Sequence, residues 1–283
     1  MDITTIAGKT TLVTGAASGI GRETALAFAR RGADLVLCDI DEAGLAETEG
    51  RARELGREVL CRRVDVSSRE EMAAFAEAVH ERAPAVDILV NNAGVAIGGG
   101  FLHTSLDDWE WIQGINLTGV IHGCHFFAPA MVERGRGGHI VNVSSLAGIV
   151  ASAALAAYAT TKFAVFGLSE ALREELAPHG IGVTAVCPGI INTPITSSAR
   201  LRGPMMNRPD ARPKMIEVYR RRNYGPDRVA ENILKAIARN RAVAPISPEA
   251  WVAYYLKRFA PGLVRWLNAK MGERGRRLNG DGG

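Results

Sequence analysis

Short apolar segments alternate with longer segments of helical periodicity along most of the chain. The short segments are rich in Val, Ile and Leu, and they cover residues 10–14, 34–38, 59–64, 87–90, 139–143, 182–186 and 242–246. Near-continuous apolarity is typical of strands that are buried on both faces of a parallel sheet. Between them, segments such as residues 22–31 and 70–82 have the spacing of amphipathic helices. This alternation predicts an α/β fold with a doubly wound sheet.

Three further segments extend or interrupt the alternation. Ser105 and Asp108 have the spacing of a helix cap, so we expect a long helix to begin there and to run through Asn116. Residues 194–224 are rich in Pro, Arg and Met, and predict a long loop with at most one short helix. In residues 251–283, two stripes of aromatic and apolar residues separated by Pro261 predict two further helices.

A glycine-rich turn follows the first predicted strand and opens the first predicted helix. It reads Thr14-Gly15-Ala16-Ala17-Ser18-Gly19-Ile20-Gly21. Glycines with this spacing allow a tight turn and let the backbone approach a pyrophosphate, whose charge is favoured at a helix N-terminus. The strand before the turn and the helix after it favour a dinucleotide-binding turn over an ordinary one.

The end of the second predicted strand carries Asp39, 18 residues after Gly21. A carboxylate at this position accepts hydrogen bonds from the ribose hydroxyls of an adenosine and repels a 2′-phosphate. Ser18 and Ile40 offer no positive charge to offset that repulsion, and Arg22 is expected on the helix surface. We therefore predict NAD as the cofactor, with NADP the less favoured alternative.

Tyr158 and Lys162 are four residues apart in a predicted helix and therefore share one face. A free tyrosine has a pKa of about 10, which is too high for a base at neutral pH. A nearby ammonium stabilises the phenolate and lowers that pKa, which would make Tyr158 a usable acid/base group. Ser145 lies 13 residues before Tyr158, and Ser144 is the competing serine.

These motifs, in this order and spacing, resemble those of the short-chain dehydrogenase/reductase family over residues 7–246. The resemblance implies a Rossmann-type three-layer sandwich around a seven-stranded parallel sheet. It also implies a single dinucleotide-binding catalytic domain over residues 1–250, in which residues 194–224 cover the substrate. Residues 251–283 would then be a basic, aromatic, helical C-terminal extension.

The resemblance implies a role for each residue that matches a family motif. Tyr158 would exchange a proton with the substrate oxygen, and Ser145 would hydrogen-bond that oxygen. Lys162 would bind the nicotinamide ribose and lower the pKa of Tyr158, while Asn116 would hold a water that links Lys162 to solvent. Thr193 would bond the nicotinamide carboxamide. The implied cofactor-binding set is Gly15, Ser18, Gly19, Ile20, Gly21, Asp39, Asp65, Val66, Asn92, Ala93, Gly94, Tyr158, Lys162, Pro188, Gly189, Ile191 and Thr193, and the substrate set is Ser145, Ala147, Leu155, Tyr158 and Ile190.

The distribution of charge changes the expected partners. The net charge of +4 and the pI near 9.0 suggest a nucleic acid or a membrane surface. However, residues 1–193 carry 15 Lys and Arg against 23 Asp and Glu, whereas residues 194–224 carry 8 against 2 and residues 251–283 carry 7 against 2. The excess positive charge therefore lies in the predicted substrate loop and the tail, and we expect no nucleic-acid partner.

Alternatives stay open for both basic segments. The loop is either a solvated loop with scattered charge or a surface that attracts an anionic or carrier-borne substrate, and Met205, Met206 and Met215 could add an adaptable apolar lid. The tail could cover the pocket, pack on another subunit or lie on an anionic membrane.

The cysteines, the N-terminus and the longest apolar stretch narrow the class of protein further. Cys38, Cys61, Cys124 and Cys187 are scattered without a histidine at ligand spacing, so we expect no metal site and reduced thiols. The first five residues lack the features of a signal peptide, and Lys162 interrupts the apolar residues 150–166. We therefore predict a cytoplasmic protein.

Together these features predict an NAD-dependent oxidoreductase that interconverts a secondary alcohol and a ketone. A bulky hydrophobic substrate is expected because the expected pocket residues, including Leu146, Leu155 and Ile191, are apolar. One alternative is a ketoreductase that acts on carrier- or CoA-linked acyl or polyketide intermediates, and another is a non-catalytic, cofactor-binding regulatory protein. A homodimer or homotetramer is expected.

Overall fold

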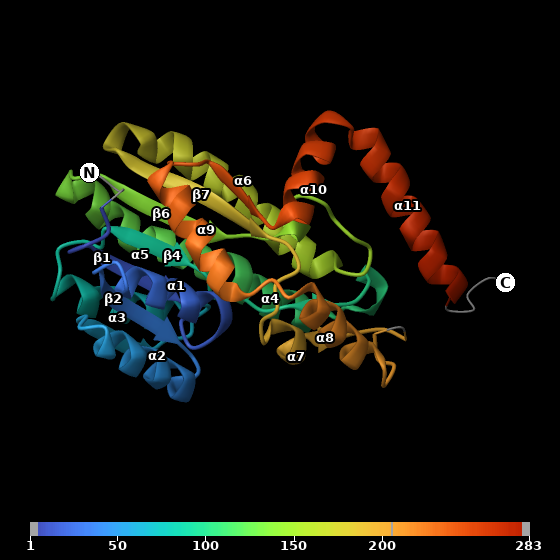
Figure 1. The fold of residues 1–283 in the computed structure, drawn as a ribbon, viewed down its shortest axis with the longest axis horizontal. Coiled ribbons are helices and arrows are strands. Elements are labelled where there is room, and N and C mark those ends of the chain that lie inside the picture. The colour runs from blue at the N-terminus through green and yellow to red at the C-terminus, as the bar shows by residue number, and fades with distance from the viewer. Residues whose placement is uncertain (1–4, 205, 279–283) are drawn as a thin grey trace.

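A parallel sheet forms the middle layer of the protein, with helices on both of its faces (Figure 1). The computed structural model describes residues 5–204 and 206–278, so Met205 lies outside the described residues. The seven strands of the sheet have the order β3-β2-β1-β4-β6-β7-β9. Their bounds are β1 Thr10–Thr14, β2 Asp34–Asp39, β3 Val59–Arg63, β4 Ile88–Asn91, β6 Gly138–Val143, β7 Ile181–Pro188 and β9 Val243–Ile246.

Two apolar cores hold the helices against the sheet. One core joins the sheet to α1 Gly19–Ala29, α2 Glu42–Glu54 and α9 Pro226–Ala238. The other joins the opposite face to α3 Arg69–His80, α5 Gly119–Arg134 and α6 Ala156–Leu176. The predicted doubly wound sandwich and its seven parallel strands are confirmed. All eight residues of β7 are buried, which explains why such strands read as continuous apolar segments.

The helix predicted to begin after Ser105 is present. Its first part, α4 Leu106–Gln113, is capped by the Ser105 hydroxyl, which accepts a hydrogen bond from the backbone amide of Asp108 at 3.2 Å. It passes through a π-helical segment, Gly114–Thr118, into α5. The whole stretch is long and apolar enough to span a membrane, but half of its most apolar window is buried inside the protein, so it is weak evidence for a span.

The prediction for residues 194–224 was wrong, because the segment is more ordered than a loop. It contains α7 Ile195–Ser198, a short strand β8 Arg200–Leu201 that pairs with β5 Ile97–Gly98, and α8 Ala211–Arg222. No residue of α8 is buried, and Met215 and Tyr219, one turn apart on one face, are its only residues that line the large cavity of the protein, so its apolar pattern in the sequence is weak. Ion pairs within and before it, such as Lys214 with Asp210, support it instead.

The two helices predicted for the tail are present as α10 Pro248–Phe259 and α11 Pro261–Leu278. They form a hairpin, and α11 lies at the edge of the protein, at the right of Figure 1, where Asn268 donates a hydrogen bond to the Ala151 carbonyl. Over the described part of the chain, the remaining elements are three short 3-10 turns, at Phe101–His103, Leu146–Gly148 and Ala177–His179.

Candidate active site

A cavity of about 690 Å³ lies at the carboxyl ends of the central strands, where ligands bind in open α/β sheets. Among the residues predicted for the site, all except Gly21 and Asn116 line this cavity. Segments that are distant in the sequence therefore meet there: the glycine-rich turn, the ends of β4 and β6, the start of α6 and the segment after β7.

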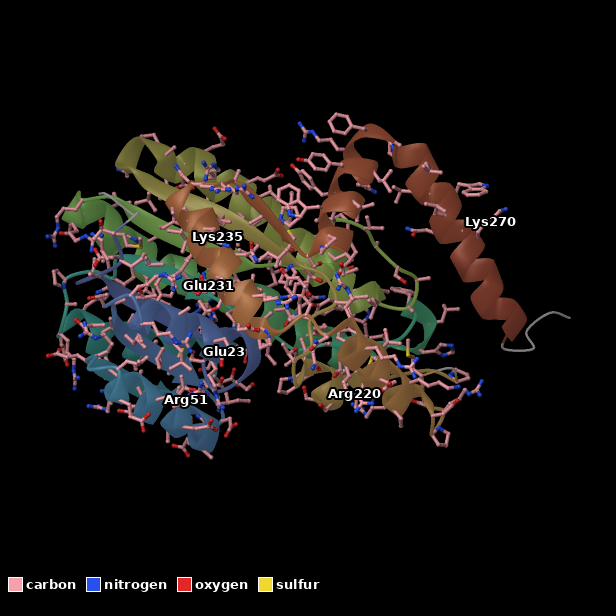
Figure 2. All side chains as sticks on the ribbon, in the orientation of Figure 1. Glu23, Arg51, Arg220, Glu231, Lys235 and Lys270 are labelled. Atoms are coloured by element: carbon pink, nitrogen blue, oxygen red, sulfur yellow. The ribbon has the colours of Figure 1, made fainter. Side chains whose placement is uncertain are left out.

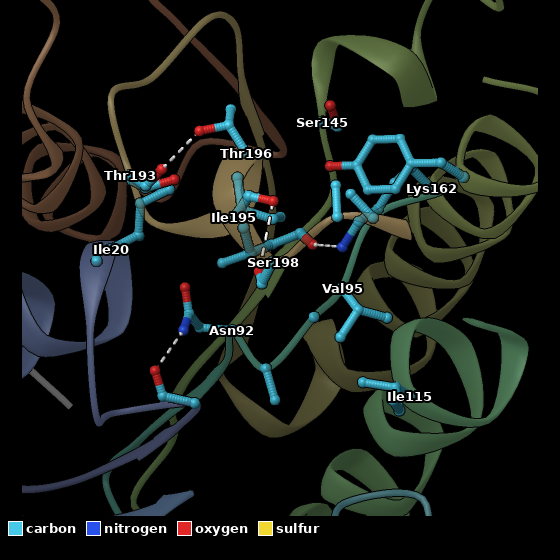
Figure 3. A pocket seen from close by; sticks show the side chains of 18 of the residues that line it. Ile20, Asn92, Val95, Ile115, Ser145, Lys162, Thr193, Ile195, Thr196 and Ser198 are labelled. Atoms are coloured by element: carbon cyan, nitrogen blue, oxygen red, sulfur yellow. Dashed lines mark hydrogen bonds between the residues drawn. The ribbon is translucent and has the colours of Figure 1, made fainter. Parts of the chain in front are cut away.

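Gly21 does not line the cavity but packs against the glycine-rich turn from the side of α1. A Cβ atom on Gly21 would lie 1.9 Å from the carbonyl oxygen of Gly15, so only glycine lets α1 pack this closely against the turn. The Asn92 amide donates to the carbonyl oxygens of Thr14 and Gly15, both at 3.0 Å (Figure 3). Gly15 itself has a φ of 66°, which favours glycine. The turn is therefore fixed to the loop that follows β4.

One end of the cavity carries the carboxylate of Asp39 and no cation. The Asp39 oxygens accept hydrogen bonds from the backbone amides of Ala17 and Asp41, at 2.9 and 3.1 Å, so the side chain is held in place. The Arg22 guanidinium is engaged with α2, where it donates to Glu47 at 2.6 Å. Among the described residues that line the cavity, Lys162 is the single Lys or Arg, and it lies at the other end.

The two serines after β6 have different surroundings. The Ser144 hydroxyl is buried and donates to the backbone carbonyl of Lys162 at 2.7 Å. The Ser145 hydroxyl accepts from the amide of Ala147 at 3.1 Å and lies close enough to the Tyr158 hydroxyl to lower its pKa. This arrangement favours Ser145 over Ser144 as the serine that reaches a substrate.

Lys162 is fully buried beside Tyr158. Its ammonium donates to the backbone carbonyl of Val143 at 3.0 Å, and its Nζ lies 5.8 Å from the centre of the Tyr158 ring (Figure 3). Burial lowers the pKa of Lys162 to about 8, and raises the pKa of Tyr158 to about 12. The hydrogen bond from Ser145 partly opposes the rise for Tyr158.

The lowering of the Tyr158 pKa that was expected from Lys162 is therefore absent in this structure. The cost of burying the phenolate exceeds any gain from the ammonium, which bonds to the Val143 carbonyl instead.

Asn116 lies behind the cavity, in the π-helical segment. Its side chain both accepts from the amide of Val95 at 2.8 Å and donates to the carbonyl of Val95 at 3.0 Å. A Cβ atom on Gly94 would lie 3.3 Å from the Asn116 oxygen and 3.4 Å from the Lys162 ammonium, so the two side chains flank this glycine. Asn116 thus holds the loop after β4 next to Lys162, and its link to solvent stays a prediction.

A buried carboxylate attaches the segment of residues 194–224 to α4. Asp108 accepts two hydrogen bonds from Arg202, at 2.6 and 2.9 Å, and one from Arg200 at 3.1 Å. The hydrogen bonds from Arg202 are the main reason why the pKa of Asp108 lies below its usual value, although burial opposes this. The Arg200 guanidinium lies 3.5 Å from the centre of the Trp111 ring, which forms part of the cavity wall. We call Asp108, Arg200, Arg202 and Trp111 the Asp108 clamp.

Most other cations of this segment also have partners inside the protein. The Arg212 guanidinium donates to the backbone carbonyls of Thr196, Ser197 and Ala199. Further ion pairs join Asp210 to Arg208 and Lys214, Glu217 to Arg220 and Arg221, and Glu249 to Arg222. Seven of the eight cations of this segment share four carboxylates and Arg212 bonds to carbonyls, so each has a partner inside the protein but the segment keeps an excess of positive charge.

Several cavity residues had no signal in the sequence. Trp111, Leu201 and Tyr219 line the cavity, but their positions depend on how α4, β8 and α8 pack around it. Met215, which was expected in an apolar lid, does line it.

Known proteins share both the sequence pattern and the fold. The short chain dehydrogenase family matches residues 9–202. The "Probable oxidoreductase EphD" of Mycobacterium tuberculosis is 43% identical over 256 residues, which cover 89% of this chain but 43% of EphD. The chain therefore spans less than half the length of that relative. The oxidoreductase UcpA of Escherichia coli is 43% identical over 197 residues, 68% of this chain and 73% of UcpA.

A solved structure with the same fold carries a dinucleotide. The crystal structure of a short chain dehydrogenase/reductase from Burkholderia phymatum in complex with NAD has a TM-score of 0.83 and 34% sequence identity, and covers 92% of this chain and 96% of that one.

The high pKa of Tyr158 can be measured directly. In the protein without cofactor, the tyrosinate absorbance that is lost in Tyr158→Phe should appear only above pH 10, and Ser145→Ala should shift it to still higher pH by removing a stabilising hydrogen bond. The measurement is the difference absorbance between wild type and Tyr158→Phe during an alkaline titration. Ionisation of Tyr158 at or below pH 10 would contradict the assignment of burial as the dominant cause.

The Asp108 clamp predicts a specific loss of stability. Asp108→Asn should lower the free energy of unfolding by about 1–3 kcal/mol, because two partly exposed arginines lose their buried partner. The exposed neighbour Asp107 provides the matched control, and Asp107→Asn should change stability by less than about 0.5 kcal/mol.

The loss of stability in Asp108→Asn should depend on pH, while Asp107→Asn remains the control. Since folding lowers the pKa of Asp108, its contribution is complete above the unfolded value of about 4 and is lost as pH falls through the lower folded value. Urea unfolding at several pH values would measure this. A difference between Asp108→Asn and wild type that persists at the lowest pH would show that the clamp is not ionic.

Proposed function

This chain belongs to the short-chain dehydrogenase family of oxidoreductases, and we propose that it uses NAD to interconvert a secondary alcohol and a ketone on a bulky hydrophobic substrate. The observation that carries the proposal is the arrangement of Ser145, Tyr158 and Lys162 around one end of a cavity whose other end holds the glycine-rich turn and Asp39. A purely regulatory role has less support, because a protein that only binds the cofactor has no need for this set of polar groups.

The chain's residues fit a dinucleotide. Gly15 and Gly19 both have positive φ and present their backbone to the cavity where α1 begins, which suits a pyrophosphate. Asp39 is fixed by two backbone amides at the far end, where no Lys or Arg lines the cavity to pair with a 2′-phosphate. This end therefore favours NAD over NADP.

The remaining residues of the predicted set would hold the rest of NAD. Asp65 and Val66 would contact the adenine, Lys162 the nicotinamide ribose and Thr193 the carboxamide. The loop residues Asn92, Ala93, Gly94, Pro188, Gly189 and Ile191 would complete the walls. When bound, the nicotinamide ring supplies the hydride acceptor or donor for the reaction.

Tyr158 would move the proton. With a pKa of about 12, its hydroxyl is protonated at neutral pH and ready to donate to a carbonyl oxygen that is being reduced. In the oxidation direction the phenol must first lose this proton. The Ser145 hydroxyl is the group that lowers the pKa of Tyr158, and the Lys162 ammonium lies 5.8 Å from the centre of its ring. Ser145 would also orient the substrate oxygen.

The substrate end supports an apolar molecule. Its walls come from the segment after β6, the start of α6, the loop after β7 and the segment of residues 194–224. The apolar and aromatic residues there are Trp111, Leu146, Ala147, Val150, Leu155, Ile190, Leu201, Met215 and Tyr219. In the carrier-linked alternative, the anionic carrier would meet the excess positive charge of residues 194–224, where Arg200 and Arg202 share one carboxylate. A cytoplasmic homodimer or homotetramer remains part of the proposal.

The proposed acid/base role predicts a strong effect on turnover. Tyr158→Phe should lower kcat by about 10²–10⁴-fold, while the Kd for NAD, measured by calorimetry, should change little. Ser145→Ala should also lower kcat, whereas Ser144→Ala, its matched control, should mainly lower stability because Ser144 bonds to the Lys162 carbonyl. Turnover of Tyr158→Phe at the wild-type rate would refute the role.

The proposed cofactor preference depends on one carboxylate. Asp39→Ala should raise the ratio of kcat/KM with NADP to kcat/KM with NAD by at least about tenfold, since it removes the charge that repels a 2′-phosphate. Asp41→Ala is the control, because Asp41 instead caps α2 through the amide of Gly44. An unchanged ratio in Asp39→Ala would contradict the assignment of NAD.

A further inference from the structure

The hairpin of α10 and α11 carries an unusual combination of side chains. Residues 250–270 contain four cationic residues and no Asp or Glu. The same stretch exposes six large apolar residues: Val252, Tyr255, Phe259, Leu263, Trp266 and Leu267, with exposed fractions from 39% to 76%. We propose that this hairpin binds the surface of an anionic lipid bilayer.

The exposed residues form a stripe on each helix. Val252, Tyr255 and Phe259 are spaced by three and four residues on α10, which places them on one face. Leu263, Trp266 and Leu267 do the same on α11. Ala250 and Val264 are buried instead, so a different side of each helix packs on the protein. These apolar stripes are therefore free to enter the interfacial region of a bilayer.

Aromatic and cationic groups occur together on this hairpin. The rings of Tyr255 and Phe259 are stacked with centres 6.2 Å apart, which pre-orders the apolar surface of α10. On α11, the Lys270 ammonium lies 4.4 Å from the centre of the Trp266 ring, and Figure 2 shows Lys270 on the outer side of this helix. Rings next to ammonium groups are typical of protein surfaces at the level of lipid headgroups.

Charge distinguishes the bilayer from a second copy of the chain. If two copies met through this hairpin, the cations of residues 250–270, which are Lys257, Arg258, Arg265 and Lys270, would be brought together with no carboxylate from the same stretch to compensate them. Anionic headgroups would compensate these charges. Residues 1–193, with 15 basic and 23 acidic residues, would be repelled by the same surface, so the charge asymmetry also orients the protein on it.

The hairpin lies next to the substrate end of the cavity. The Asn268 amide donates to the backbone carbonyl of Ala151 at 3.1 Å, and the flanking residues Val150 and Ser152 line the cavity. α10 packs on the turn Leu146–Gly148, which also lines it. Docking would thus bring the cavity to a bilayer in which an apolar substrate dissolves. This consequence rests on the proposed function, whereas lipid binding does not.

Vesicle flotation with the full chain tests the proposal. The wild type should float with vesicles of phosphatidylcholine and phosphatidylglycerol, with roughly one lipid in three anionic, and bind at least about tenfold less to phosphatidylcholine alone. The double variant Phe259→Glu, Trp266→Glu should lose at least about tenfold in affinity for the anionic vesicles. The control Leu102→Glu, Leu106→Glu replaces residues that are 90% and 80% exposed elsewhere and should bind like wild type.

Two results would overturn the proposal. One is a wild type that does not bind the anionic vesicles. The other is a double variant of the hairpin that binds the vesicles as well as wild type but forms a smaller assembly without lipid, as measured by light scattering. That result would show that the hairpin is a contact between subunits. Flotation does not depend on enzymatic turnover. The lipid-binding result can therefore be interpreted even if the proposed enzymatic function is wrong. Because the substituted residues are exposed, the thermal midpoint of the double variant should match that of the wild type.

Discussion

The parallel direction of the strands is the constraint on which the site depends. Since β1, β4, β6 and β7 run in one direction and pair as neighbours, their carboxyl ends lie at one edge of the sheet. Side-chain hydrogen bonds then join the loops at that edge, as where the Thr14 hydroxyl accepts from the amides of Asn92 and Ala93 at 3.0 and 3.1 Å. The glycine-rich turn, the serines and the segment after β7 converge for this reason.

Burial sets the chemistry of the groups that converge there. It raises the pKa of Tyr158 and lowers that of Lys162, so the same cause disfavours both charged forms. A buried phenolate and a buried ammonium stabilise each other, and each is costly alone. In this structure Ser145 opposes the rise in the pKa of Tyr158, whereas the Lys162 ammonium is held by the Val143 carbonyl.

Sequence reasoning recovered the features that are encoded locally. Most of the seven strands could be predicted because burial on both faces leaves continuous apolar segments, whereas the edge strand β3 is only partly buried. The site residues could be predicted because they have fixed spacings next to those strands. The Asp108 clamp could not be predicted, because Arg200 and Arg202 lie 92 and 94 residues from their carboxylate. Because Asp108 could not be recognised as their partner, the charge of Arg200 and Arg202 suggested that the segment attracts an anionic substrate. α8 was missed because none of its residues is buried.

The cavity has a cofactor end that favours NAD and an apolar substrate end, and the Tyr158 hydroxyl lies between them. The most direct test is the rate of NAD-linked and NADP-linked turnover over a series of secondary alcohols and ketones of increasing apolar size. The account predicts turnover with NAD that improves as the apolar part of the substrate grows. Turnover confined to NADP, or to small polar alcohols, would contradict it.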